Sequence, residues 1–296
     1  MSSKPARIFA FERVWVTASP DGLKVIEWRL NKSFPLPAGT IEFYVEFARA
    51  AGEWTRLNPD SPETNTCVFV DPDPRRCGYA NNEFYRVVMV VAGTSYHSTP
   101  EPTLGVWNTH DWLIARDVVR KEYLRLKRYA GVLGHLLKRR EHGPKCTACL
   151  DWDTEDVVNT DCAFCYGTGY IGGYYDAIPY YMDLSGSATN RDVRQPFGES
   201  DNRKHTGRSV AYPMLNSYDL WVDGDKNKRY IVRQVEDTVE IKGRPLVYTS
   251  ELRELPASST EYSVPLEQDL TDEIGVAPDS PESAGWRRDI DFIELY

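Results

Sequence analysis

The chain has 296 residues, a net charge of −9 and the ordinary composition of a globular protein. This length exceeds what one hydrophobic core usually supports, so two or three domains are expected. No apolar h-region of a signal peptide follows the first seven residues, and the longest apolar run, 87–92, is too short to span a bilayer. We therefore expect a protein made in a reducing cytosol, with no membrane partner, in which regular cysteine patterns favour metal binding over disulfides.

The charge is unevenly distributed along the chain. Residues 1–105 carry 11 basic and 12 acidic side chains, residues 106–145 carry 10 and 4, and residues 146–296 carry 14 and 28. One basic segment thus separates a nearly neutral region from an acidic region. This pattern suits interlocking subunits better than a uniformly basic nucleic-acid-binding protein.

Residues 1–105 are predicted to form a small antiparallel β-sandwich. Apolar side chains alternate with their neighbours over 42–47 and 84–91, as in half-buried strands, and Ile26 and Trp28 share one face of a third run. These runs follow one another closely, with no helical pattern between them. Cys67 and Cys77, which flank the loop after 68–70, are expected to be free thiols, with a disulfide as the alternative.

The order of these residues resembles a fibronectin type III module. Trp28 matches the core tryptophan of an early strand, 44–47 matches the middle strand, and Tyr85-Arg86-Val87 matches the strand that bears a tyrosine. The resemblance covers about the first hundred residues and implies a two-sheet sandwich.

Residues 106–183 are predicted to contain one long basic helix followed by a metal module. Asn108-Thr109-His110-Asp111 has helix-start chemistry, in which Thr109 or Asp111 can cap free backbone N–H groups. Gly143-Pro144 ends the pattern, giving about eight turns with Gly131 or Gly134 as the place of a bend. Apolar residues recur at near-helical spacing: Trp112, Ala115, Val119, Leu126, Leu133 and Leu137.

The other faces of this expected helix are basic. A charge run usually marks a solvated helix face. The alternative is a helix that faces a neighbouring subunit or DNA. The candidate DNA- or subunit-facing residues are Arg116, Arg120, Lys121, Arg125, Arg128, Lys138, Arg139 and Arg140.

The strongest motif is a pair of CxxC knuckles, Cys146/Cys149 and Cys162/Cys165, separated by twelve residues. Two such knuckles present four thiolates tetrahedrally, with Zn–S distances of about 2.3 Å. We predict a structural Zn²⁺ site, because a complete thiolate shell leaves no position for a reactive water; an iron centre or two disulfides are the alternatives. The nearby His142 is expected to be a bystander.

The run 167–172 spells GxGxxG but lacks the preceding strand and following helix of a dinucleotide-binding unit. We interpret its glycines as tight backbone turns around the metal knuckle. The five histidines lie in no nucleophile motif, and the sequence contains no P-loop, GxSxG or HExxH. The chain is therefore not predicted to be an enzyme.

The C-terminal part is predicted to be a small β-barrel or open sheet. After a polar loop over 184–208, strands at 218–222 and 230–235 flank a hairpin turn, and a second turn at 242–245 precedes a strand at 246–252. Residues 261–296, with 10 acidic and 2 basic side chains, read as an extended arm with an apolar end. The expected fold is thus mainly β with one long helix, divided at 1–105, 106–183, 184–260 and 261–296.

Four segments of this part resemble the β-domain of tailed-bacteriophage neck proteins, the head–tail connector or head-completion subunits. The helix at 117–129, leading into a CxxC pair, also resembles phage neck or tail structural proteins. The segments are Arg208-Ser-Val-Ala-Tyr-Pro213, Asp219-Leu-Trp-Val222, Lys228-Arg-Tyr-Ile-Val232 and Gly243-Arg-Pro-Leu-Val247.

This resemblance implies a structural protein of the virion neck, assembled in the host cytoplasm as a homo-oligomeric ring, commonly of twelve or six copies. The expected partners are portal or adaptor proteins, tail-terminator-type proteins and genomic DNA in the channel, with the fibronectin-like module as an outer decoration. Another tail or baseplate subunit is the first alternative, and a zinc-containing nucleic-acid-binding protein is the second.

Overall fold

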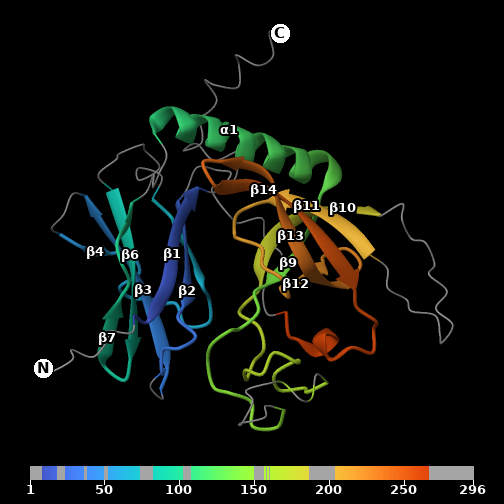
Figure 1. Cartoon of the computed structure of the whole chain (residues 1–296), viewed down its shortest axis with the longest axis horizontal. Coiled ribbons are helices and arrows are strands. Elements are labelled where there is room, and N and C mark those ends of the chain that lie inside the picture. The colour runs from blue at the N-terminus through green and yellow to red at the C-terminus, as the bar shows by residue number, and fades with distance from the viewer. Residues whose placement is uncertain are drawn as a thin grey trace, which may run out of the picture.

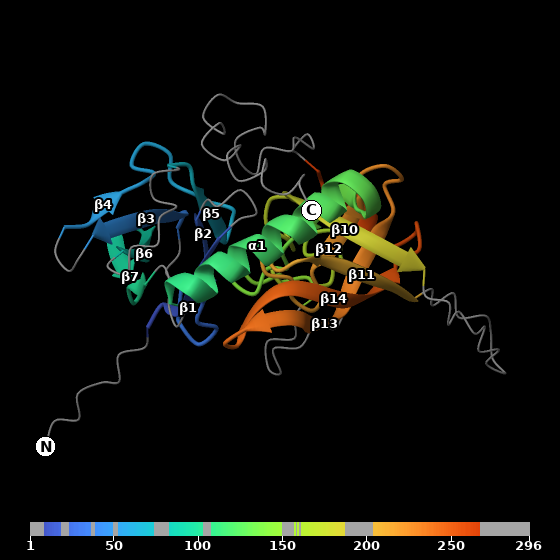
Figure 2. The same cartoon turned by 90° about the horizontal axis from the view of Figure 1, so that it is seen from above.

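The computed structural model describes residues 9–18, 24–36, 39–49, 53–73, 83–102, 108–149, 157, 159, 161–186 and 204–266. These residues form a mainly β structure with one α-helix and a closed six-stranded barrel. Two N-terminal sheets lie beside the barrel, and the helix α1 runs across the top of both parts (Figures 1 and 2). Cys77 and the segment 267–296 lie outside the described residues. The described helices include none that is long and apolar enough to cross a membrane.

The N-terminal part contains two antiparallel sheets. One has the order β1-β2-β5; the other has the order β4-β3-β6-β7, with β8 also paired to β6. The strands are β1 (Phe11–Ala18), β2 (Lys24–Leu30), β3 (Ile41–Arg49), β4 (Thr55–Arg56), β5 (Val68–Asp71), β6 (Glu83–Val91), β7 (Thr94–His97) and β8 (Glu101–Pro102).

The two sheets share one hydrophobic core, built by the alternation that the sequence shows. Ile26 and Trp28 from β2 pack with Val45 from β3 and Val87 from β6, all buried. The rings of Trp28 and Phe43, one from each sheet, lie 5.1 Å apart. The strand assignments over 42–47 and 84–91 are therefore confirmed, because period-2 patterning directs alternate side chains to one face of a strand.

Helix α1 (Thr109–Arg125) begins with a capping box and continues into one π-helical turn, Leu126–Ala130. Asn108 Oδ1 accepts a hydrogen bond from Asp111 N at 2.8 Å, and the Asp111 carboxylate accepts one from Asn108 N at 3.3 Å. The cap is thus Asn108, with Asp111 as its reciprocal partner. The expected apolar stripe is buried against the barrel; it comprises Trp112, Ala115, Val119 and Leu126.

The helix ends earlier than we expected from the sequence. Gly131 is extended (φ −94°, ψ 150°), and strand β9 (Val132–Leu137) follows it. Leu133 and Leu137 match helical spacing by coincidence, while two glycines within four residues each weaken a helix by about 1 kcal/mol. A Cβ atom at Gly134 would lie 2.3 Å from the Val222 carbonyl oxygen. Gly134 thus permits the close pairing of β9 with β12 in the barrel.

The barrel has the strand order β10-β11-β14-β13-β12-β9, closed by the pairing of β9 with β10. Met182, Trp221, Val232 and Leu246 are fully buried in the core that the barrel shares with α1. The remaining strands are β10 (Ile178–Gly186), β11 (Lys204–Val210), β12 (Leu220–Asp223), β13 (Arg229–Ile241) and β14 (Arg244–Glu254), and a 3-10 turn, η3 (Thr260–Ser263), follows.

Both expected hairpins are present in the barrel. Val222 pairs with Arg229 across the first, and Ile241 pairs with Arg244 across the second. The expected loop over 184–208 is shorter at both ends, because β10 and β11 pair as far as Gly186 and His205. The barrel also crosses the expected boundary at 183/184, since β9 and most of β10 precede it.

The N-terminal sheets contact both α1 and the β13–β14 hairpin. Lys24 Nζ lies 3.6 Å from the centre of the Trp112 ring, within the range of a cation–π contact. Arg244 donates to the Val16 carbonyl oxygen at 3.2 Å and to Glu101 Oε1 at 3.1 Å. The two β parts are therefore joined at several points.

Candidate metal centre and the joint beside it

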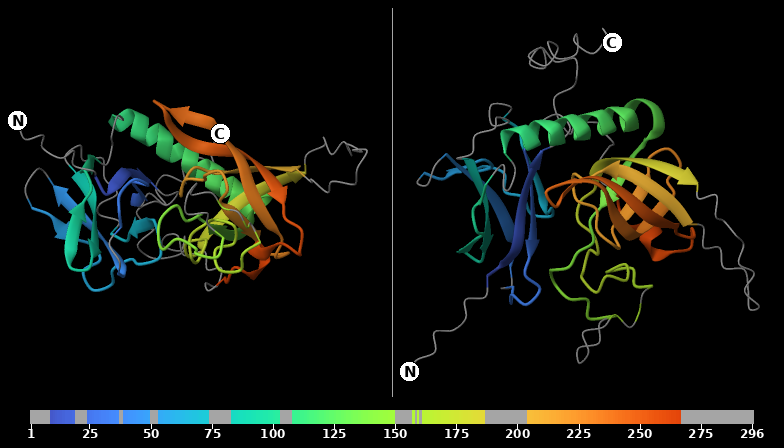
Figure 3. Two further views of the ribbon diagram at one scale, coloured as in Figure 1. Left: turned by 60° about the horizontal axis from the view of Figure 1, so that its bottom comes forward. Right: turned by 45° about the horizontal axis from the view of Figure 1, so that its top comes forward.

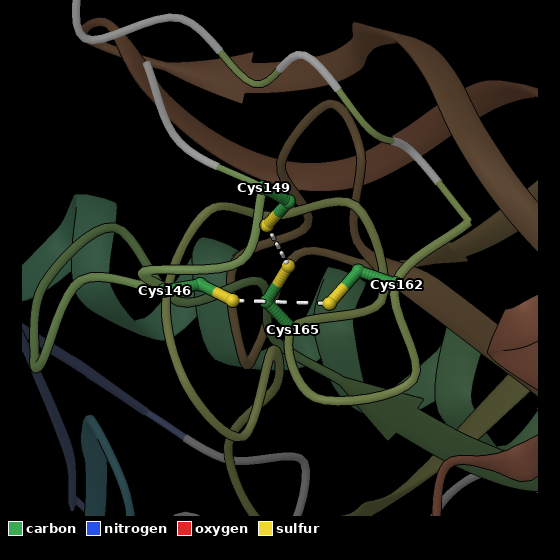
Figure 4. A group of neighbouring side chains, drawn as sticks. All are labelled: Cys146, Cys149, Cys162 and Cys165. Atoms are coloured by element: carbon green, nitrogen blue, oxygen red, sulfur yellow. Dashed lines mark hydrogen bonds between the residues drawn. The ribbon is translucent and has the colours of Figure 1, made fainter. Parts of the chain in front are cut away.

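The four knuckle cysteines lie together in the insertion 138–177, which connects the paired strands β9 and β10. This insertion lies at the end of the barrel away from α1 (Figure 1). Figure 4 shows the four sulfur atoms turned toward one another, and all four side chains are buried. The expected four-cysteine cluster is therefore present, but it is an insertion within the barrel and not a module at the helix end.

The spacing of the sulfur atoms suits one metal ion. All four Sγ atoms lie within 4.8 Å of one another. The Sγ atoms of Cys146 and Cys162 are 3.8 Å apart, which is the separation of two sulfur ligands in a tetrahedral site with metal–sulfur bonds of about 2.3 Å. The Sγ atoms of Cys149 and Cys165 are closer, at 2.9 Å. Both distances exceed a disulfide bond of about 2.05 Å, so these four thiols are free and not paired as two disulfides.

The local backbone favours a thiolate in this cluster. The amide N–H groups of Phe164 and Cys165 lower the pKa of Cys162 to about 7. Burial raises the pKa of Cys149 and of Cys165, so these thiols need a cation to deprotonate fully. The four cysteine side chains therefore fit a metal cation bound between them.

The glycine-rich run turns the chain around this cluster. Gly167 (φ 73°) and Gly169 (φ 85°) adopt the left-handed conformation that other residues avoid. Cys146 N donates to the Gly169 carbonyl oxygen at 2.8 Å, and Thr168 N donates to that of Cys165 at 2.9 Å. These hydrogen bonds hold the two knuckles together, in agreement with our interpretation of the GxGxxG run.

A buried ion pair fixes the insertion to the barrel. Lys138, the first residue after β9, places Nζ 2.7 Å from Asp219 Oδ2, and it also donates to the Met214 carbonyl oxygen. Asp219 Oδ1 accepts from Arg139 N at 2.9 Å, and its Oδ2 accepts from Asn216 N at 2.8 Å. Asp219 directly precedes β12, so these contacts tie the start of the insertion to the segment that leads into β12.

The N-terminal sheets close this joint from the other side. The Glu27 carboxylate accepts from Met214 N at 2.9 and 3.1 Å. His142 Nε2 lies 2.7 Å from the Leu30 carbonyl oxygen, so His142 bonds to β2 and, as expected, stands outside the four-cysteine set. Arg29 Nε donates to Glu141 Oε2 at 2.7 Å.

These contacts surround a cavity of about 150 Å³. Burial raises the pKa of Glu27 to about 7, although the Lys138 ammonium opposes this shift. Burial also raises the pKa of the neighbouring Cys67 thiol to about 12. The lining includes Trp28, Cys67, Lys138, Tyr175, Ser217 and Asp219.

The sequence did not reveal this joint. Glu27 and Met214 are 187 positions apart, and Lys138 and Asp219 are 81 apart. The one local signal is a lysine directly after an apolar strand, which is ordinary at a strand end. No sequence pattern therefore separates Lys138 from a solvated lysine.

The eight basic residues singled out in the sequence fall into two groups. Arg116 and Arg120 are partly exposed on α1, and Lys121 and Arg128 are exposed on α1 and its π-helical turn. Arg125 donates to Glu122 Oε1 and, at 3.0 Å, to Asp183 Oδ2 on β10. Arg125 thus ties α1 to the barrel.

Lys138, Arg139 and Arg140 do not lie on the helix, because the helix ends before β9. Lys138 is buried in the joint. The Arg139 guanidinium lies 5.2 Å from the centre of the Tyr218 ring, and Arg140 Nε donates to the Tyr174 carbonyl oxygen at 3.0 Å. Lys138 and Arg139 therefore hold the metal insertion to the barrel, and Arg140 joins the two ends of the insertion. These positions correct the expected place of all three on a basic helix face.

Neither a scan against protein-family models nor a search of curated proteins finds a match for this sequence. Function is therefore inferred from the sequence pattern and the geometry of the described residues.

Proposed function

We propose that this chain is a structural subunit of a tailed-phage virion that forms part of the neck, the ring that connects the DNA-filled head to the tail. The observation that carries the proposal is the buried joint around Lys138 and Asp219. It unites the barrel, the metal insertion and the N-terminal sheets through contacts between residues far apart in sequence. Contacts of this kind make the subunit rigid, which suits a structural protein that must keep its shape in the assembled particle.

In this proposal the barrel strands over 218–252 build the ring, and α1 lies at the subunit boundary or toward the DNA channel. The ring has twelve or six copies and contacts portal or adaptor proteins on one side and tail-terminator-type proteins on the other. It is assembled in the host cytoplasm and resides in the virion. The role is mechanical and not enzymatic.

We propose Zn²⁺ as the ion held by Cys146, Cys149, Cys162 and Cys165. Four buried thiolates at CxxC spacing are typical of structural zinc, and a full shell leaves no position at which water could be activated. The ion would keep the insertion folded, because the free energy of metal binding adds to that of folding.

We also propose that the N-terminal sheets are a fibronectin type III-like module that decorates the outside of the ring. A three-stranded sheet, β1-β2-β5, and a second sheet in the order β4-β3-β6-β7 support this assignment. The buried Tyr85 hydroxyl on β6 donates to Asp71 Oδ2 at 2.8 Å, which ties one sheet to the other. A sandwich of this kind carries its binding loops at its two ends.

The test of the neck assignment is the position of the protein in assembled particles. Cryo-electron microscopy of virions should show density for the barrel and the N-terminal sheets at the head–tail junction, in a closed ring. Gold-labelled antibody against an epitope tag on the chain should bind at the same place. Density confined to the baseplate would replace the neck by the alternative tail position.

Two solution results would overturn the structural assignment altogether. One is catalytic turnover by the purified chain. The other is sequence-specific, salt-sensitive DNA binding by a monomer that is lost in an Arg116→Ala/Arg120→Ala/Arg128→Ala variant. Cation–phosphate contacts make such binding depend on salt, and base contacts make it depend on sequence.

A further inference from the structure

The outward side of α1 is apolar as well as basic. Leu113 and Ile114 are 37% and 43% exposed, and Tyr129, in the π-helical turn, is 84% exposed. Lys121 and Arg128 lie exposed beside them. In the view from above, α1 lies in front of the described strands (Figure 2). We call these five residues the outer helix face.

The charge on this side of α1 is positive. Arg116 and Arg120 flank the outer helix face and are partly exposed. Over α1 and its π-helical turn, six basic residues stand against three acidic ones. Asp111 pairs with Lys242 and Glu122 pairs with Arg125 and Arg208, while Asp117 shares the charge of Lys121 at 2.8 Å. A matching partner would therefore combine negative charge with apolar side chains.

The chain itself contains a segment of this composition. Residues 267–296 include nine acidic and two basic side chains. Apolar side chains stand among these charges: Trp286, Ile290, Phe292, Ile293, Leu295 and Tyr296. The acidic residues of this segment thus match the positive charge of the outer helix face, and its apolar residues match the exposed apolar side chains of that face.

The chain leaves the described region far from its own outer helix face. Arg229 donates to the Val264 carbonyl oxygen at 3.1 Å, and Val264 packs with Tyr174 of the metal insertion. This is the end of the barrel opposite α1 (Figures 1 and 3). Thirty residues span up to about 100 Å when extended, which is enough to reach another molecule.

We propose that residues 267–296 of one copy bind the outer helix face of a second copy. Carboxylates of the segment pair with Lys121, Arg128 and the flanking arginines, and its apolar side chains cover Leu113, Ile114 and Tyr129. Because the donor and acceptor surfaces differ, each copy can bind one neighbour through each surface, and such head-to-tail contacts form a ring when the rotation between copies closes. This inference deepens the proposed neck ring and rests on it.

Sedimentation velocity of the full-length chain provides the test, with a synthetic peptide of residues 267–296 as competitor. The wild-type chain is expected to self-associate, and the peptide is expected to disperse the assembly. The charge reversals Lys121→Glu and Arg128→Glu, made together, should weaken self-association by about tenfold or more and leave the circular dichroism unchanged. High salt should weaken the wild-type assembly as well.

Two matched controls separate this contact from general electrostatics. Arg13→Glu with Arg56→Glu reverses two exposed cations of the N-terminal sheets, which lie outside both α1 and the ring-building strands. This variant should associate like wild type. A peptide in which Ile290, Phe292, Ile293 and Leu295 are replaced by serine keeps its charge and should not compete.

A monomeric wild-type chain would overturn the inference, as would an assembly that resists both the peptide and the Lys121/Arg128 reversal. If such a resistant assembly were found at the head–tail junction, the neck assignment would stand and the copies would contact one another through a different interface. If the peptide disperses the assembly but the chain is absent from the head–tail junction, the contact between copies is supported and the neck assignment fails.

Discussion

Lys138 Nζ lies 2.7 Å from Asp219 Oδ2 in the joint between the metal insertion and the barrel, and the two side chains are only 6% and 2% exposed. Each charge is removed from water and is compensated mainly by the other and by backbone groups of Met214, Arg139 and Asn216. Removal of one partner therefore leaves an uncompensated buried charge.

Lys138→Met should lower the free energy of unfolding by about 3–5 kcal/mol, because it strands the Asp219 carboxylate. Urea denaturation at neutral pH measures the change. The matched control is Lys121→Met, which removes an exposed partner of Asp117 and should cost about 1 kcal/mol or less. Equal losses in the two variants would contradict a buried role for Lys138.

Glu27 should make stability depend on pH. Its pKa is raised to about 7 in the folded chain, against 4.5 for the ordinary carboxyl group. Since the folded state holds this proton more tightly than the unfolded state, the contribution is complete below pH 4.5 and is lost as pH rises through 7. The loss across this window is about 3 kcal/mol.

Urea titrations at about pH 5 and about pH 8 test this dependence. Glu27→Gln cannot ionise, so the stability difference between the two pH values should shrink relative to wild type. Glu53→Gln, at an exposed position, should retain the wild-type difference. Parallel pH profiles for wild type and Glu27→Gln would show that burial of this carboxyl group does not govern the joint.

Cys162→Ser should abolish stoichiometric metal binding, whereas the wild-type chain should carry one ion per copy by elemental analysis. Hydrogen exchange should then accelerate over 144–175, because the free energy of metal binding, on the order of 10 kcal/mol, no longer supports the insertion. Residues 1–105 should keep their protection, and assembly into particles should fail. Cys67→Ser, which lies outside the cluster, is the control. Wild-type protein with neither zinc nor iron would refute the metal centre.

Gly134→Ala should be among the most damaging single-methyl additions in the barrel. The new Cβ would meet the Val222 carbonyl oxygen at 2.3 Å and the Trp221 ring at 2.7 Å, and paired backbone cannot give way cheaply. A loss of about 3 kcal/mol or more in thermal or urea unfolding is expected. Gly243→Ala has open space around it and a φ of 72°, so it should cost only about 1–2 kcal/mol. A reversed order would argue against the close β9–β12 contact.

The features that sequence reasoning predicted are those encoded by neighbouring residues. The CxxC pairs, the period-2 runs around Val45 and Val87, and the turn at Lys242-Gly243 each carry their signal within a few positions. Hairpin turns and strand faces follow from such local rules.

The features that it missed depend on distant partners. The spacing of Leu133 and Leu137 extended a helical pattern into β9, and only the pairing of β9 with β10 and β12 decides the strand. Glu27 shares its strand face with Val25 and Arg29, and nothing near it in the sequence indicates that its carboxylate accepts from the Met214 amide of the barrel. Propensity is a weak guide wherever such tertiary contacts override it.

The position of the metal insertion between β9 and β10 has a consequence for how this protein can change. Leu136 and Ile178, on either side of the insertion, are already ladder partners, so both ends of the intervening chain are held close together whatever lies between them. Addition or loss of such a segment costs little loop-closure entropy. A lineage could therefore acquire, enlarge or discard the part of the insertion that carries the four cysteines while keeping the joint residues at its start, without redesigning the barrel. An engineer could graft a different binding loop at the same place.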